Sequence, residues 1–232
     1  MCFSATASFL ASGLLTMAGV ATYSQVIDRR QMMLASIPLL FAVQQAAEGI
    51  VWLSFGYDTF AWLRIIAAYF FLFFAFIIWP TWVPLSIYCL ESMMEFKDNS
   101  HDYIRKRLLL YKIMIIIGFL VSCYFIVNLF RYNLVVQVFD CHILYKLPSK
   151  LTLLKLPSIL YFLLTIVPLL LSRESMIRFI GVLFSFAFLV TYCFYYYLLI
   201  SVWCFFAALL SILTFVVIYK QRNNTYEQPN NG

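Results

Sequence analysis

The sequence predicts an all-α protein, a polytopic membrane bundle of seven transmembrane helices, and three observations support this fold class. Of its 232 residues, 64% are hydrophobic and only 11% are charged, whereas a soluble domain carries about 25% charged residues. The apolar residues form long continuous runs, not the alternating pattern of a membrane β-barrel. Unpaired backbone groups are costly in lipid, which requires helices. The composition excludes a soluble globular domain, a disordered or collagen-like chain and, despite the net charge of +6, a nucleic-acid-binding protein.

The first two predicted spans cover residues 3–26 and 32–55. A spanning helix needs about 20 apolar residues, because the hydrocarbon core is about 30 Å thick. In the first span, Ser4, Ser8 and Ser12 recur every four residues, and small residues of this kind let transmembrane helices approach closely. No basic segment precedes the apolar run, so we expect a retained helix and not a cleaved signal peptide.

The third and fourth predicted spans cover residues 60–90 and 108–130. The third is long and contains the sequence Trp-Pro-Thr-Trp-Val-Pro at residues 79–84. Because proline interrupts the backbone hydrogen bonds of a helix, this motif predicts a kink or an end before Glu91. Residues 91–107 are polar and charged, which is typical of a solvated connection.

The connection at residues 131–156 has a different pattern. The runs at 135–139 and 143–145 are rich in β-branched and aromatic residues, and they flank Asp140, Cys141 and His142. This pattern predicts a short β-hairpin. Lysines that alternate with leucines follow it, which is typical of a segment at the lipid headgroups. We therefore expect a lid over the outer end of the bundle.

The last three predicted spans cover residues 156–172, 177–198 and 201–220. Pro157 and Pro168 predict that the first of these helices begins at one proline and bends at the other. The 41 residues from Phe179 to Tyr219 contain no charge. As one helix they would extend about 60 Å, twice the membrane thickness. The chain must therefore fold back near residues 199–201.

Lysines and arginines predict the orientation, since cytoplasmic loops carry an excess of them. With the N-terminus outside, eleven of the sixteen lie inside, namely Arg29, Arg30, Lys97, Arg105, Lys106, Arg107, Lys112, Arg173, Arg178, Lys220 and Arg222. Five lie outside, namely Arg64, Arg131, Lys146, Lys150 and Lys155. We predict an N-out, C-in topology. Residues 1–220 would form one transmembrane domain and residues 221–232 a polar, disordered cytoplasmic tail.

Glu48 is the acidic residue that lies well inside an apolar run, and Gln44 and Gln45 precede it. Gln44 and Glu48 share a helix face because they are four residues apart. A carboxylate within a span is costly and marks a functional site by default. One interpretation is a ligand-binding group, or a catalytic one with Glu48 as general acid or base. The other is an uncharged Glu48 that hydrogen-bonds to another helix for packing alone.

The cysteines are concentrated in the outer half of the predicted bundle, where five of the six lie: Cys2, Cys123, Cys141, Cys193 and Cys204. Cysteine and histidine are ligands for zinc or copper, so Cys2, Cys141 and His142 are candidate metal ligands. Alternatively, Cys2 and Cys141 form a disulfide, which the outer compartment permits. The third interpretation is unligated cysteines packed between helices. The spacing favours no metal or redox motif.

These residues together predict a polar pocket in the outer leaflet that binds or transports a small molecule. Its floor would be Glu48 with Gln44 or Gln45. Tryptophan is typical of the membrane boundary, and the rim would consist of Cys2, Cys141, His142 and Trp203. The expected partners are the lipid bilayer and a small-molecule or lipid ligand, and a metal ion such as zinc or copper is the cofactor considered.

Four separated motifs cover nearly the whole chain. They are Met1–Phe9, Pro38–Gly49, Trp79–Pro84 and Ser201–Ala208. Together they resemble an uncharacterised bacterial family of seven-span membrane proteins that begin Met-Cys-Phe-Ser-Ala. The resemblance implies a multi-pass protein of the bacterial inner (cytoplasmic) membrane, and it implies no activity. Three hypotheses therefore stay open: a binding or transport protein, a membrane-embedded enzyme that uses Glu48 with or without a metal, and a structural or sensory module.

Overall fold

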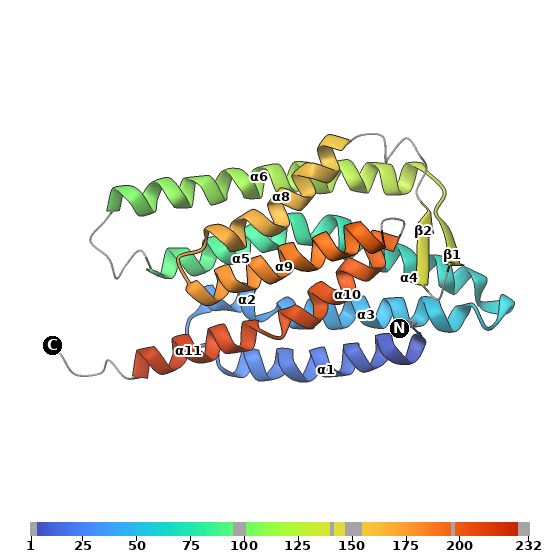
Figure 1. Ribbon diagram of the computed structural model, residues 1–232, viewed down its shortest axis with the longest axis horizontal. Coiled ribbons are helices and arrows are strands. Elements are labelled where there is room, and N and C mark those ends of the chain that lie inside the picture. Colours follow the sequence, from blue (N-terminus) through green and yellow to red (C-terminus); the bar gives the residue numbers. More distant parts are fainter. Residues whose placement is uncertain (1–3, 95–100, 140–141, 147–154, 196–197, 227–232) are drawn as a thin grey trace.

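The computed structural model describes residues 4–94, 101–139, 142–146, 155–195 and 198–226. These residues form a bundle of long helices with a small β-hairpin at one end (Figure 1). Within them, six helical stretches are long and apolar enough to cross a membrane. The predicted helical, multi-pass membrane architecture is confirmed at this level.

The N-terminal stretches correspond to the first two predicted spans. Helix α1 covers Ala5–Ser24. The second stretch is a 3-10 turn followed by helices α2 and α3, which cover Arg29–Gln31, Met32–Ala35 and Ile37–Ser54.

Helix α1 lies close against α3, as its small residues predict. The Ser12 hydroxyl donates a hydrogen bond to the carbonyl oxygen of Ala42 at 2.8 Å. A Cβ atom added at Gly19 would lie 2.6 Å from the Leu39 side chain. The two backbones therefore approach as closely as a glycine permits.

The third stretch consists of α4 (Ala61–Phe73), a π-helical segment (Phe74–Ile78) and α5 (Trp79–Met94). The π-helical segment immediately precedes the Trp-Pro motif, where a proline lacks the N–H of a regular helical turn. The predicted irregularity is therefore present. The predicted end before Glu91 is wrong, since α5 continues past Pro84 to Met94.

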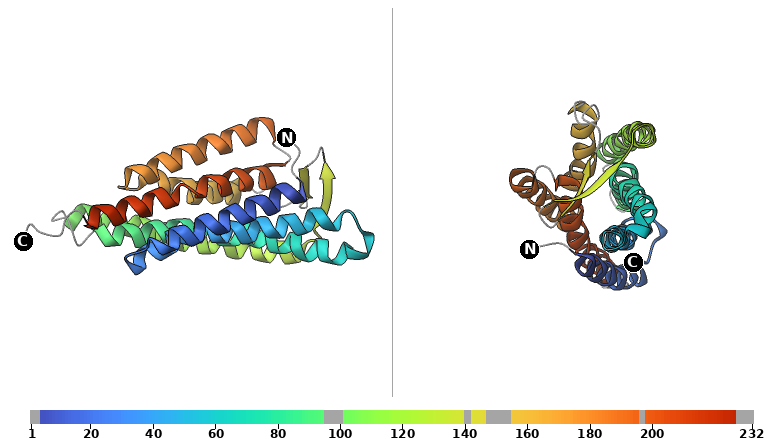
Figure 2. Two further views of the ribbon diagram at one scale, coloured as in Figure 1. Left: turned by 90° about the horizontal axis from the view of Figure 1, so that it is seen from below. Right: turned by 90° about the vertical axis from the view of Figure 1, so that its right-hand side faces the viewer.

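Helix α6 covers His101–Arg131 and leads into the predicted hairpin. Strands β1 (Val135–Phe139) and β2 (His142–Lys146) pair antiparallel, with Phe139 opposite His142. Viewed from this end, the two strands lie across the bundle (Figure 2). We call this the hairpin end. The hairpin is confirmed, and its position on the outer side of a membrane stays a prediction.

The C-terminal part contains four helices: α8 (Lys155–Leu171), α9 (Ser175–Phe194), α10 (Leu199–Ser211) and α11 (Thr214–Tyr226). Pro168 lies inside α8, as expected. The chain reverses between α9 and α10, slightly earlier than predicted. Residues 227–232 of the predicted tail lie outside the described residues.

Helix α11 continues to Tyr226, into the segment that the sequence predicts as a tail from residue 221. Gln221 is buried and accepts a hydrogen bond from the Gln31 side chain at 2.9 Å. This contact between buried amides fixes the helix beyond the last apolar residues.

Candidate functional site

Two carboxylates are buried among the described residues, and they lie in different helices. Glu48 in α3 is 3% exposed and Glu91 in α5 is 2% exposed. A buried carboxylate needs hydrogen-bond or cationic partners, because its transfer out of water is otherwise costly. The partners of each group therefore indicate its role.

Glu48 has few partners. The Ser201 hydroxyl of α10 donates a hydrogen bond to its carboxylate. The Gln45 side chain also donates a hydrogen bond to it, and the Gln45 amide oxygen has no hydrogen-bond partner in the described part of the chain. No ion pair to Glu48 occurs among the described residues, whereas Glu91 and Glu174 each pair with a basic side chain.

Gln44 connects this carboxylate region to α5 and α10. Its side-chain oxygen accepts a hydrogen bond from the Trp79 indole at 2.9 Å, and the Trp79 ring stacks on Phe41 with centroids 3.9 Å apart. Its side chain also hydrogen-bonds to Cys204 of α10. Gln44 is thus held between α5 and α10.

The hairpin contributes Tyr145 to the same region. Its ring stacks on Phe71 of α4 with centroids 4.9 Å apart, and it packs in one apolar cluster with Val51 and Cys204. Its hydroxyl is buried without a partner in the described structure. Burial raises the pKa of Tyr145 well above its usual range, and the nearby Glu48 carboxylate raises it further. The phenol is therefore a neutral donor near Glu48.

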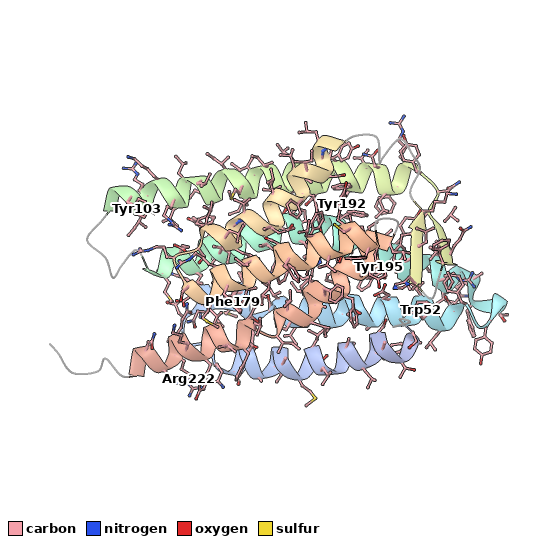
Figure 3. The ribbon with its side chains drawn as sticks, viewed as in Figure 1. Trp52, Tyr103, Phe179, Tyr192, Tyr195 and Arg222 are labelled. Atoms are coloured by element: carbon pink, nitrogen blue, oxygen red, sulfur yellow. The ribbon has the colours of Figure 1, made fainter. Side chains whose placement is uncertain are left out.

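Two tryptophans add indole N–H groups without described partners. Trp52 packs against the cluster that contains Tyr145 and lies toward the hairpin end (Figure 3). Trp203 is buried at 6% exposure, with Tyr161 and Phe188 at its ring edges. Trp203 therefore lies inside the bundle, and not on the lipid-facing surface where tryptophans of the membrane boundary lie.

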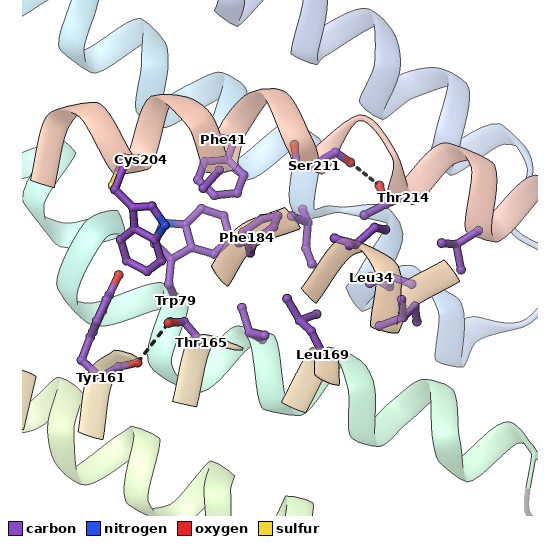
Figure 4. Close-up of a pocket in the computed structure, with 17 residues that line it drawn as sticks. Leu34, Phe41, Trp79, Tyr161, Thr165, Leu169, Phe184, Cys204, Ser211 and Thr214 are labelled. Carbon is purple, nitrogen blue, oxygen red and sulfur yellow. Dashed lines mark hydrogen bonds between the residues drawn. The ribbon is translucent and has the colours of Figure 1, made fainter. Parts of the chain in front are cut away.

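A cavity of about 50 Å³ adjoins the carboxylate region. Trp79, Trp203 and Cys204 line it together with apolar side chains from α2, α3, α5, α8, α9, α10 and α11 (Figure 4). The hydroxyls of Thr165 and Ser211 donate to carbonyls of their own helices. The described cavity is therefore apolar, and Glu48, Gln44 and Gln45 are not among its lining residues.

The predicted metal ligands are described only in part. His142 is buried in β2, with its ring 5.4 Å from the Tyr195 ring. Cys2 and Cys141 lie outside the described residues. Within the described ranges, no three histidine, cysteine or acidic side chains are grouped to hold a metal ion. The metal and disulfide hypotheses stay predictions.

Glu91 is the site residue that sequence reasoning missed, because residues 91–107 looked like a solvated loop. Its carboxylate accepts hydrogen bonds from the Ser172 hydroxyl at 2.9 Å and from the Arg173 backbone N–H at 2.6 Å. The Arg107 guanidinium lies 3.9 Å away. A signal was present, since buried Val83, Ile87 and Leu90 recur at helical spacing up to Glu91.

Three arginines near Glu91 also bind carbonyls where helices end. Arg30 donates to Ser92 at 3.1 Å, Arg107 to Leu171, and Arg178 to both Ser172 and Arg173 at 2.8 Å. Cations at helix C-termini satisfy carbonyls that lack helical partners. We call this region, opposite the hairpin, the arginine end. Its buried carboxylate is paired on several sides, although Arg107 Nε has no hydrogen-bond partner among the described residues.

The chain matches a protein family among those with known sequence models. The model of a family of unknown function (DUF6629) matches residues 1–229. No curated protein and no solved structure matches the chain.

Proposed function

The chain belongs to this family of unknown function (DUF6629), and from that premise we propose that it is a membrane protein that binds a small molecule at Glu48. The floor of the site is Glu48 with Gln44 and Gln45, as the sequence predicts. Tyr145 and Ser201 complete it. A transporter and a membrane receptor both require such a binding step within the bundle.

Seven crossings and an N-out, C-in orientation are part of this proposal. Helix α8 has 17 residues, so it extends about 25 Å, and spanning helices begin at about 17 residues. Added to the six longer stretches, it makes seven. The arginine end carries Arg30, Arg107 and Arg178, which favours the cytoplasmic side for it. The hairpin end then lies outside a bacterial inner membrane.

One observation carries the binding proposal: a buried carboxylate surrounded by polar groups without partners. Buried polar side chains are hydrogen-bonded in the large majority of cases. Near Glu48, the Gln45 amide oxygen and the Tyr145 hydroxyl are both without described partners. If the carboxylate served packing alone, the polar groups beside it would be expected to have hydrogen-bond partners. A bound molecule supplies the missing partners.

The test is to identify small molecules that co-purify with the full-length protein. Protein in lipid nanodiscs is extracted with solvent, and the extract is analysed by mass spectrometry. We expect a species in the wild type that is lost from Glu48→Gln. Ser86→Ala is the control, since Ser86 is a buried serine of α5 that bonds a carbonyl of its own helix and does not line the cavity.

Retention of the same species by Glu48→Gln would contradict the proposal. So would the finding that the wild-type and Glu48→Gln extracts are identical and contain only bulk lipid. Loss from both Glu48→Gln and Ser86→Ala would indicate general damage to the packing of the bundle, and would also count against a specific site.

A further inference from the structure

The side-chain groups around Glu48 that lack hydrogen-bond partners include more donors than acceptors. Two side-chain groups toward the hairpin end can donate hydrogen bonds and have no described partner: Trp52 Nε1 and the Tyr145 hydroxyl. Trp203 Nε1 adds a third on the cavity side. The unpartnered groups that can accept are Gln45 Oε1 and the Tyr145 hydroxyl oxygen, whereas an indole nitrogen only donates. The site therefore has more unpartnered donors than acceptors, and a ligand must supply acceptors.

An anionic ligand would supply acceptors, but Glu48 opposes it. No cation pairs with Glu48 among the described residues. At the hairpin end, Arg64 is committed elsewhere, since it donates to the Ser54 carbonyl at 2.8 Å and lies 4.0 Å over the Phe55 ring. An anion would thus enter without a countercharge.

A cationic ligand would pair with Glu48, but an ammonium group only donates hydrogen bonds. The indole donors would remain unpaired in its presence, and each unpaired buried donor is costly. A neutral molecule with both a carbonyl oxygen and an N–H or O–H group meets both requirements. Its oxygen accepts from the donors, and its hydrogen is offered to Glu48 or Gln45.

The adjoining cavity limits the remainder of the ligand. Cys204 lies beside Gln44 and lines the cavity, and Trp79 both lines it and holds Gln44. The cavity is apolar and its volume is about 50 Å³, a few times the roughly 10–15 Å³ that a single water needs on this measure. It accepts a short apolar group of a few atoms.

We infer that the Glu48 site takes a small neutral molecule that joins a carbonyl acceptor and a hydrogen-bond donor to a short apolar chain, as in a primary carboxamide. This inference rests on the proposed function. It assigns Tyr145 and Trp203 as residues that determine specificity, through donors directed at the carbonyl oxygen.

Three probes with the same four-carbon chain test the charge preference: butyramide, butylammonium and butyrate. Each is added to the full-length protein in detergent, and the thermal midpoint of unfolding is measured. We expect butyramide at several times its Kd to raise the midpoint by about 2–4 °C. Butylammonium and butyrate are expected to give no shift.

Matched variants locate the effect. Tyr145→Phe and Trp203→Phe each remove a donor and keep an aromatic ring, and we expect both to reduce the butyramide shift at least twofold. Tyr124→Phe is the control, because its hydroxyl is also buried without a described partner but lies in a separate cluster on α6. It should leave the shift unchanged.

A shift with butylammonium that disappears in Glu48→Gln would overturn the inference and support the proposed function. A shift with butyrate, or with no probe, would also overturn the inference. The co-purification experiment then decides the proposed function separately, since it does not depend on these probes.

Discussion

Glu48 and Glu91 are equally buried carboxylates whose surroundings differ. Glu91 has a hydroxyl donor, a backbone N–H donor and an arginine. Glu48 has the hydroxyl of Ser201 and a set of neighbours without partners. Burial alone therefore does not mark a functional carboxylate. The difference in partners separates a group that stabilises the arginine end from one that is available to a ligand.

The largest expected effect is on Glu91. Glu91→Ala leaves Arg107 and the Arg173 N–H without their acceptor, and breaking a buried pair in this way costs about 3–5 kcal/mol. Unfolding followed by circular dichroism in detergent measures the loss. Glu174→Ala is the control, since Glu174 pairs with the half-exposed Lys220 at 3.9 Å, and exposed pairs contribute about 0–1 kcal/mol. Equal losses in the two variants would refute a special role for Glu91.

A smaller effect is expected at Tyr111 in the same network. Its hydroxyl accepts a hydrogen bond from Arg107 at 3.4 Å, and the side chain is fully buried. Tyr111→Phe should therefore lower the free energy of unfolding by about 0.5–1.5 kcal/mol. An unchanged free energy would show that the paired network ends before Tyr111.

The smallest effect is expected at Tyr145, near Glu48. Because its hydroxyl has no described partner, Tyr145→Phe removes no protein hydrogen bond, and the free energy of unfolding should change by less than about 0.5 kcal/mol. The same measurement as for Tyr111 applies. A larger loss would mean that the Tyr145 hydroxyl has a structural role, and would weaken the contrast between the two ends.

Much of the fold follows from local sequence pattern. The apolar runs are long enough to predict each helical stretch, and the runs at 135–139 and 143–145 predict the hairpin. The charge-free stretch from Phe179 to Tyr219 predicts a reversal because its length exceeds the membrane. These properties depend on neighbours in the chain, so the sequence contains them directly.

The sites depend on contacts between residues that are distant in the sequence, and a local sequence pattern does not contain these contacts. Glu48 was selected because a charge inside a span is rare, but its partner Ser201 lies 153 residues away. Glu91 was misjudged because the charges that follow it resemble a loop, whereas Ser172 and Arg173 pack onto it from another helix. The sequence pattern predicts Trp203 at the membrane boundary, because nothing local shows that α8 and α9 cover it.

The most direct measurement compares Glu48→Gln with Glu91→Gln, an identical change at both carboxylates. The free energy of unfolding and the co-purified molecules are determined on the same samples. We predict that Glu48→Gln stays within about 1 kcal/mol of the wild type and loses the bound species, while Glu91→Gln loses more stability and its folded fraction retains the species. A stability loss at Glu48 as large as that at Glu91, with the bound species retained, would contradict the account.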